Sequence, residues 1–136
     1  MGAPTERVTA WRPGVPGIVE VLHARFTEHA YPMHTHDAWT LLIVDDGAIA
    51  YDLDRGHHGA LQPQVTLLPP HVPHDGRAAT RLGFRKRVLY LDPAVLGEDL
   101  VGAAVDAPTM PDPVLRQWIH RLHRALDSPG DAFAAE

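Results

Sequence analysis

Short segments rich in β-branched and aromatic residues, separated by turn-forming residues, constrain the fold of this chain more than any other feature. The sequence predicts strands over residues 18–26, 39–44, 48–53, 65–68 and 84–91. It predicts turns over residues 45–47, 54–59 and 75–77. Short strands at regular spacing with turns between them are typical of antiparallel sandwiches and barrels. The sequence therefore predicts a mainly β fold.

Three details sharpen this prediction. Residues 1–17 are rich in proline and glycine, which predicts an irregular N-terminal arm. The tight-turn signal at residues 45–47 predicts that the segments on either side of it form a hairpin. Residues 84–91 alternate in character, and side chains two residues apart on a strand share a face. One face of this strand would therefore carry Phe84, Lys86, Val88 and Tyr90.

Near the C-terminus the pattern of apolar residues changes from that of strands to that of helices. Asp92-Pro93 predicts a short helical turn, and Asp112-Pro113 is an N-cap followed by proline at the first helical position. The helix predicted over residues 114–126 has an apolar stripe that is too wide to be left in water. We expect this stripe to pack partly on the barrel and partly on a second subunit, through Leu115, Trp118, Ile119, Leu122 and Leu126.

Composition excludes several classes of protein. The chain has 136 residues, which suits one domain with one core. Its net charge of −5 argues against direct binding of nucleic acid, because phosphate binding needs a basic surface. It has no cysteine, no apolar signal segment and no apolar run long enough to span a bilayer. We expect a cytoplasmic protein that makes no contact with a membrane.

Three histidines are the strongest candidates for a site. His34 and His36 lie two residues apart, so on an extended segment both project from one wall. If His74 faces this pair, three imidazoles meet in one pocket. Imidazole nitrogen is a common ligand for Zn, Ni, Cu and Fe(II), and catalytic metal sites often use three protein ligands. Two interpretations remain open, a divalent metal site and a polar pocket without metal.

Aromatic residues supply further candidate ligand contacts. Half of the side chains in a barrel strand face inward, where Trp39, Tyr51 and Tyr90 could stack on a small molecule. The arginines near the last strand, Arg81, Arg85 and Arg87, are expected to face water. No nucleophile motif, phosphate loop or pair of carboxylates stands out, so the sequence indicates no catalytic residue.

Three motifs in order resemble those of a known family. Residues 32–37 with the following apolar strand, and residues 67–76, resemble the two cupin motifs. More narrowly, these motifs together with residues 87–96 resemble the N-terminal effector-binding domain of AraC-type transcriptional regulators. The resemblance extends over about residues 18–126 and implies a small jelly-roll β-barrel followed by helices that mediate dimerisation.

The resemblance also implies a function. Such domains are not enzymes; they bind a small effector and control a DNA-binding domain, which this sequence lacks. Because residues 132–136 have helical composition but stop early, we expect the chain to be part of a longer protein. We divide it into an arm over residues 1–17, an effector-binding barrel over 18–96 and a helical dimerisation segment over 97–136. The rival hypothesis is a stand-alone metal-dependent cupin enzyme, an oxygenase or isomerase, that uses His34, His36 and His74.

Overall fold

The computed structural model describes residues 6–28 and 30–126, which form two antiparallel β-sheets and a C-terminal helical segment. The first sheet contains, in order across it, β1 (Arg7–Trp11), β2 (Ile18–Phe26), β9 (Phe84–Leu91), β4 (Trp39–Gly47), β7 (Val65–Leu68) and β10 (Thr109–Met110). The second sheet contains β3 (Tyr31–His34), β8 (His74–Ala78), β5 (Ile49–Leu53) and β6 (Gly56–Ala60). The helices are the 3-10 turn η1 (Pro93–Val95), α1 (Leu100–Asp106) and α2 (Pro113–Leu126).

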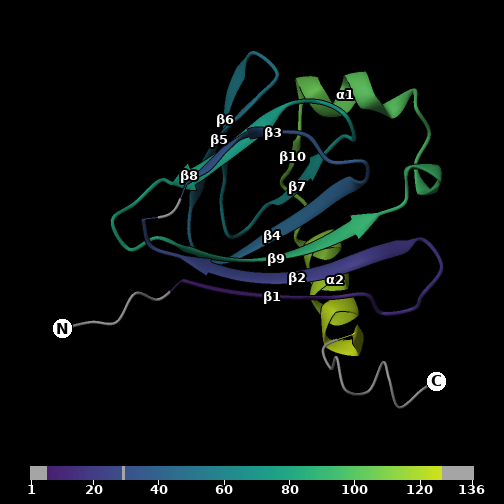
Figure 1. The fold of residues 1–136 in the computed structure, drawn as a ribbon, viewed down its shortest axis with the longest axis horizontal. Helices are drawn as coiled ribbons and strands as arrows, with labels where there is room; N and C mark the ends of the chain where they lie inside the picture. The colour runs from purple at the N-terminus through teal and green to yellow at the C-terminus, as the bar shows by residue number, and fades with distance from the viewer. Residues whose placement is uncertain (1–5, 29, 127–136) are drawn as a thin grey trace.

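The two sheets face each other and enclose the main hydrophobic core (Figure 1). Leu42 and Val88 of the first sheet belong to the same buried cluster as Tyr51 and Leu53 of the second. Alternate residues of a strand point to opposite faces, so every second residue of β4, β5 and β9 contributes to this interior. The predicted mainly β, antiparallel fold with helices at its C-terminal end is confirmed.

Part of the predicted irregular arm is a strand. Residues 7–11 form β1, which pairs with β2 in an antiparallel register. The Trp11 side chain also donates a hydrogen bond of 3.2 Å from Nε1 to the backbone oxygen of Leu126 at the end of α2. The prediction for residues 1–17 was therefore wrong over 7–11, because β2 offers a sheet edge that the local sequence does not reveal.

The predicted hairpin between residues 39–44 and 48–53 is also wrong. β4 pairs with β7 and β9 in the first sheet, whereas β5 pairs with β6 and β8 in the second. The chain crosses from one sheet to the other after Gly47, which has a φ of 72°. A Cβ atom on Gly47 would lie 2.0 Å from the backbone oxygen of Gly83, so this crossing requires glycine.

Two further turn predictions fall on strands. Residues 56–59 lie in β6 and residues 75–77 lie in β8, and each of these strands pairs with β5. Glycine and aspartate in these segments favour turns locally. Their backbone groups are instead satisfied by the sheet, so tertiary pairing outweighs the local preference.

The C-terminal helix α2 packs on the outer face of the first sheet. Asp112 caps it as predicted, since its Oδ1 accepts hydrogen bonds of 3.1 Å and 3.0 Å from the backbone nitrogens of Val114 and Leu115. Ile119 is buried in a cluster with Ile43 of β4 and Val65 of β7. This packing places one side of the predicted apolar stripe on the barrel. The expected helical tail over residues 132–136 lies outside the described residues.

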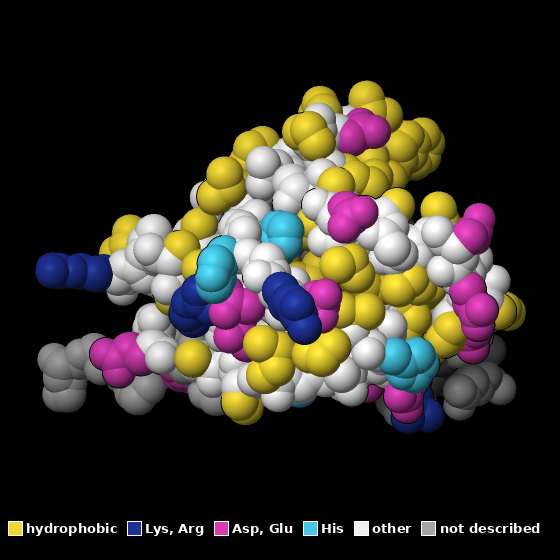
Figure 2. Space-filling model, turned by 90° about the horizontal axis from the view of Figure 1, so that it is seen from above, with side chains coloured by type: hydrophobic (Ala, Val, Ile, Leu, Met, Phe, Trp, Pro, Cys, Tyr) yellow, Lys and Arg dark blue, Asp and Glu magenta, His cyan; other side chains and the backbone are white. Residues whose placement is uncertain are grey.

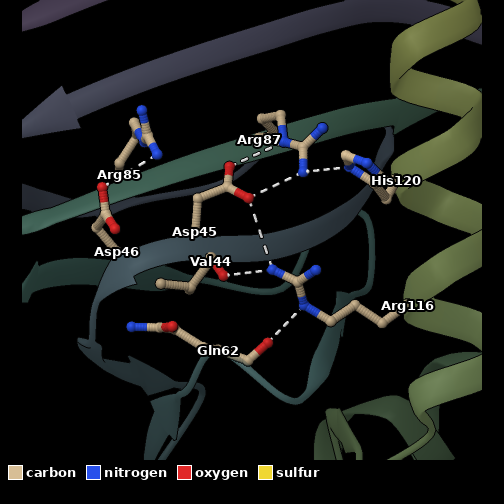
Figure 3. Close-up of polar contacts among 8 residues, drawn as sticks. All are labelled: Val44, Asp45, Asp46, Gln62, Arg85, Arg87, Arg116 and His120. Atoms are coloured by element: carbon tan, nitrogen blue, oxygen red, sulfur yellow. Dashed lines mark hydrogen bonds and ion pairs between the residues drawn. The ribbon is translucent and has the colours of Figure 1, made fainter.

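Polar contacts also attach α2 to the sheet (Figure 3). A bulge in β4 between Val44 and Asp46 directs the Asp45 side chain toward the outer face. Arg87 of β9 donates two hydrogen bonds of 2.8 Å to Asp45 and one of 2.9 Å to Nδ1 of His120 on α2. Arg116 of α2 donates a hydrogen bond of 2.7 Å to the backbone oxygen of Val44. The helix and the outer face of β4 and β9 are therefore linked by charged groups as well as by apolar packing.

Figure 2 shows acidic, basic and histidine side chains interspersed with broad hydrophobic areas on the face seen from above. Within residues 6–28 and 30–126, none of the helices is long and apolar enough to cross a membrane.

Candidate functional site

A cavity of about 450 Å³ lies between the two sheets. This volume falls in the range of small-molecule sites, which are concave, mostly apolar and lined by a few polar groups. Its apolar wall includes Leu22, Leu42, Ile49, Leu68 and Phe84. Its polar wall includes Tyr31, His34, His36, Thr40, Thr66, His74, Lys86 and Tyr90. The arrangement can enclose a small molecule with an apolar body and a polar end.

The three histidines meet on the wall of this cavity. His34 ends β3 and His74 begins β8, and the two residues are direct partners in the register of these strands. Their rings are 4.6 Å apart between centroids. His36 follows β3, and its Nε2 lies 3.1 Å from Nε2 of His34. The predicted approach of His74 to His34 and His36 is therefore what the structure shows.

Burial lowers the basicity of two of these histidines. Burial is the largest cause that lowers the pKa of His74, to about 4, and the charges of His34 and His36 are the next largest. Burial is also the largest cause that lowers the pKa of His36 below its usual value, and the charges of His34 and Lys86 add to it. Both rings are therefore neutral at pH 7 and keep a nitrogen lone pair that can bind a metal or accept a hydrogen bond.

The donor set fits a divalent metal in part. The ligand atoms of His34, His36 and His74 lie within 4.8 Å of one another. Zinc bound to imidazole at about 2.0–2.1 Å in a tetrahedral site needs nitrogens about 3.4 Å apart. The His34–His36 separation of 3.1 Å is close to this value, whereas the spread of up to 4.8 Å among the three ligand atoms exceeds it. Among the described residues no carboxylate joins this cluster.

The structure places the predicted aromatic residues in two different environments. Tyr51 and Tyr90 line the cavity, and the Tyr90 ring is 5.1 Å from that of His36 between centroids. Burial raises the pKa of both tyrosines to about 12, so they stay neutral at pH 7. Tyr31, which was not among the predicted residues, lines the cavity next to His34.

Trp39 does not line the main cavity, although the sequence predicted that it would. It is buried, but it lies beside Pro70, Pro93 and Val101 and not on the wall of the main cavity. Residues 39, 41 and 43 of β4 share a face, and Ile43 packs against α2 on the outside of the barrel. The parity of the strand therefore directs Trp39 outward, under the helical segment that follows β9.

Lys86 is the cavity residue that sequence reasoning missed. It was placed on the same strand face as Phe84 and Tyr90, which is correct, but it was not chosen as a site residue. A charged residue between apolar residues of one strand face is the signal that could have identified it. Arg85 and Arg87 face the other way and pair with Asp46 and Asp45.

The antiparallel barrel, the cavity between its sheets and the histidine cluster define a ligand-binding domain of the cupin type. A family model described as "AraC-like ligand binding domain" matches residues 16–136. The chain therefore belongs to the AraC-like ligand binding domain family. No curated protein is significantly similar to it in sequence.

Solved structures support the fold. A cupin family protein with a double-stranded β-helix fold from Methanocaldococcus jannaschii is 18% identical, with a TM-score of 0.57 over 66% of this chain and 83% of that one. A cupin superfamily protein from Desulfitobacterium hafniense is 15% identical, with a TM-score of 0.54 over 68% and 84%. At such low identities these similarities show the fold alone.

An enzyme also shares this fold. Oxalate decarboxylase from Bacillus subtilis, which has Mn(II) centres, is 12% identical, with a TM-score of 0.57 over 69% of this chain. The chain spans only 27% of the length of that enzyme. Cupin folds therefore occur in enzymes as well as in ligand-binding domains. The fold does not distinguish these functions, so the site residues have to distinguish them.

Proposed function

We propose that this chain is the effector-sensing and dimerisation domain of an AraC-type transcriptional regulator. A small molecule binds in the cavity and controls a DNA-binding domain elsewhere in the full-length protein, in the cytoplasm. The single observation that carries the proposal is that β4 and β9 have the cavity on one face and α2 on the other. A ligand that changes the inner face of these strands can therefore favour one position of α2.

Dimerisation through α2 is supported by the apolar side chains that the barrel leaves uncovered. Ile119 is buried, and Leu115 and Leu126 are partly buried. Trp118 and Leu122 of the predicted stripe are 61% and 38% exposed. Residues four apart lie on the same face of a helix, so these two side chains form one patch. Large aromatic and aliphatic side chains of this kind are typical of the centre of a protein interface.

Sedimentation velocity at micromolar concentration tests the dimer. We expect the wild-type chain to sediment as a dimer and Trp118→Glu to sediment as a monomer of unchanged thermal stability. The neighbouring exposed residue Gln117 supplies the matched control, since Gln117→Glu adds the same charge outside the patch. A wild-type monomer, or a Trp118→Glu dimer, would count against this interface.

The regulatory role has its own test. The reading frame beyond Glu136 is expected to encode a basic segment with two helix-turn-helix units, which bind DNA in the major groove. A reporter under the control of the full-length protein should respond to a cavity ligand. The Leu42→Trp variant, which fills the cavity, should lose this response. A frame that stops at Glu136 would overturn the regulatory role.

The histidine cluster favours one alternative, a metal-dependent cupin enzyme. Three imidazoles can hold a divalent ion and leave positions open for a substrate. The regulator remains the better proposal because the family model that matches the chain describes a ligand-binding domain. Turnover of a cavity ligand that requires stoichiometric metal would favour the enzyme.

A further inference from the structure

The single lysine of this chain lies inside the barrel. Lys86 is the one lysine in the sequence, and every other side chain counted among its 12 basic residues is an arginine. It is the third residue of β9, on the inward face with Phe84 and Tyr90, and it lines the cavity. Lysine is among the residues least often buried without a partner. A lysine at this position therefore requires an explanation that packing does not give.

Lys86 has no acidic partner in the described part of the chain. No ion pair joins it to a carboxylate within 4.0 Å among residues 6–28 and 30–126. Its Nζ instead lies 4.7 Å from the centre of the Tyr31 ring and 5.9 Å from that of Phe84. Aromatic faces attract a cation, but they replace lost hydration only in part.

The acidic residues on the cavity wall do not pair with the positive charge of Lys86. Asp75 accepts hydrogen bonds from the backbone nitrogen of Asp52 and from Arg77. Asp37 is fully exposed and lies 3.7 Å from His71. Glu20 lines the cavity as well, but no ion pair within the described ranges joins it to Lys86, and burial lowers the pKa of Lys86 to about 8. Lys86 is thus still mostly protonated at pH 7 and unneutralised.

We propose that the ligand of this cavity is a small monocarboxylic acid whose carboxylate pairs with Lys86. The inference rests on the proposed function, because it assigns a chemical class to the effector of the same cavity. The apolar body of the acid would lie against Leu22, Leu42 and Leu68. The neutral rings of His36 and Tyr90 offer further hydrogen bonds to the carboxylate.

The charge of the cavity selects this class over others. A single ammonium group matches a single negative charge. Lysine also binds phosphate as a point charge, but the bidentate arginines that strengthen phosphate recognition are absent from the described lining of this cavity. The nearest arginines of β9, Arg85 and Arg87, point to the opposite face and are already paired with Asp46 and Asp45.

Acids and their matched amides provide the test. Benzoate and hexanoate at millimolar concentration are compared with benzamide and hexanamide, by thermal unfolding and calorimetric titration. We expect the acids to raise the unfolding midpoint and the amides to leave it unchanged. Lys86→Met, which keeps the length of the side chain and removes its charge, should weaken acid binding by about tenfold or more. Arg85→Met removes a charge from the outer face of the same strand and should leave acid binding unchanged.

A stability measurement shows whether Lys86→Met is folded. Because the substitution removes an unpaired cation from the cavity, we expect the ligand-free variant to unfold at the same denaturant concentration as the wild type or at a higher one. A lower midpoint would show that Lys86 has an internal structural role and would overturn the inference.

A spectroscopic readout follows from the sequence. Reductive methylation with ¹³C-formaldehyde labels Lys86 and the N-terminal amine only, so benzoate should shift one assigned NMR signal. If amides bind as tightly as acids, or if Lys86→Met binds acids as tightly as the wild type, the charge assignment fails while the cavity remains a ligand site. If neither class binds the wild type, the carboxylate assignment also fails. The dimer and reporter tests then decide the proposed function separately.

Discussion

Gly83 shows how strongly a single residue is constrained in this fold. Its φ is 78°, and a Cβ atom there would lie 2.1 Å from the backbone oxygen of Phe26. Gly83→Ala combines an unfavourable backbone conformation with a collision that no flexible side chain can relieve. We expect a loss of about 1–3 kcal/mol or more in the free energy of unfolding, measured by urea denaturation. Gly102→Ala is the control, since nothing lies within 4 Å of the added Cβ, and it should be neutral or slightly stabilising.

The histidine cluster gives a second prediction for single residues. Zinc or nickel added to the metal-free protein should raise the midpoint of thermal unfolding, because an ion that binds only the folded state stabilises it. His36→Ala should abolish this increase, whereas His57→Ala, at an exposed position of β6, should retain it. Metal content of the purified variants measures the same effect. An equal thermal response in His36→Ala would contradict a three-histidine site.

The contact between α2 and the first sheet supports a prediction for these elements. The side chains of Asp45 and Arg87 are 18% and 15% exposed, whereas those of the neighbouring pair Asp46 and Arg85 are 60% and 52% exposed. Asp45→Asn leaves Arg87 without its charge partner in a partly buried position, so we expect a loss of about 3 kcal/mol in unfolding free energy. Asp46→Asn is the matched control and should cost less than about 1 kcal/mol.

Acid should weaken the same contact. Burial by itself would raise the pKa of Asp45, but Arg87, Arg116 and Arg85 more than offset it and hold this pKa below its usual value. The stability that Asp45 contributes is therefore present above a pH of about 4 and is lost as the pH falls through the lowered value. Amide hydrogen exchange in α2 at low pH measures this loss. If amide exchange in α2 of Asp45→Asn is as slow as in the wild type at neutral pH, Asp45 does not hold α2 on the sheet.

At the scale of the whole molecule, buried histidines make stability depend on pH. His123 of α2 is fully buried, and burial, followed by the charge of Arg87, lowers its pKa to about 3. An unfolded histidine titrates near 6.5, so below this pH the unfolded chain binds more protons than the folded one. The stability that neutral, buried His123 contributes is thus fully present above a pH of about 6.5. It decreases as the pH falls from there toward the lowered pKa of His123.

A variant separates the histidines that cause this dependence. The groups facing His123 are Arg87, His23, Asp45 and His120. His123→Leu removes its titration, and we expect the midpoint of urea unfolding to fall less steeply between pH 6.5 and 4, with a chelator present. Part of the slope should remain, because His74 and His36 also have lowered pKa values. A slope identical to that of the wild type would show that His123 does not contribute.

The sequence by itself determined the class of fold and identified the three histidines that meet on the cavity wall. Strand alternation along residues 84–91, the Asp112 cap and the order of the motifs are local signals, and each follows from the geometry of a strand or of a helix end. The approach of His74 to His34 and His36 was the condition that the sequence set for a common pocket, and the structure meets it.

The tertiary structure alone decided which strands pair and which face of each strand is inside. β4 and β5 lie in different sheets, and residues 7–11, 56–59 and 75–77 are strands, because hydrogen bonds to distant segments outweigh local turn preferences. Trp39 lies outside the barrel and Lys86 inside it, since a shift of one residue reverses the direction of a side chain. Local alternation groups the residues that share a face of a strand, but which of the two faces is inside is fixed by partners far away in the sequence.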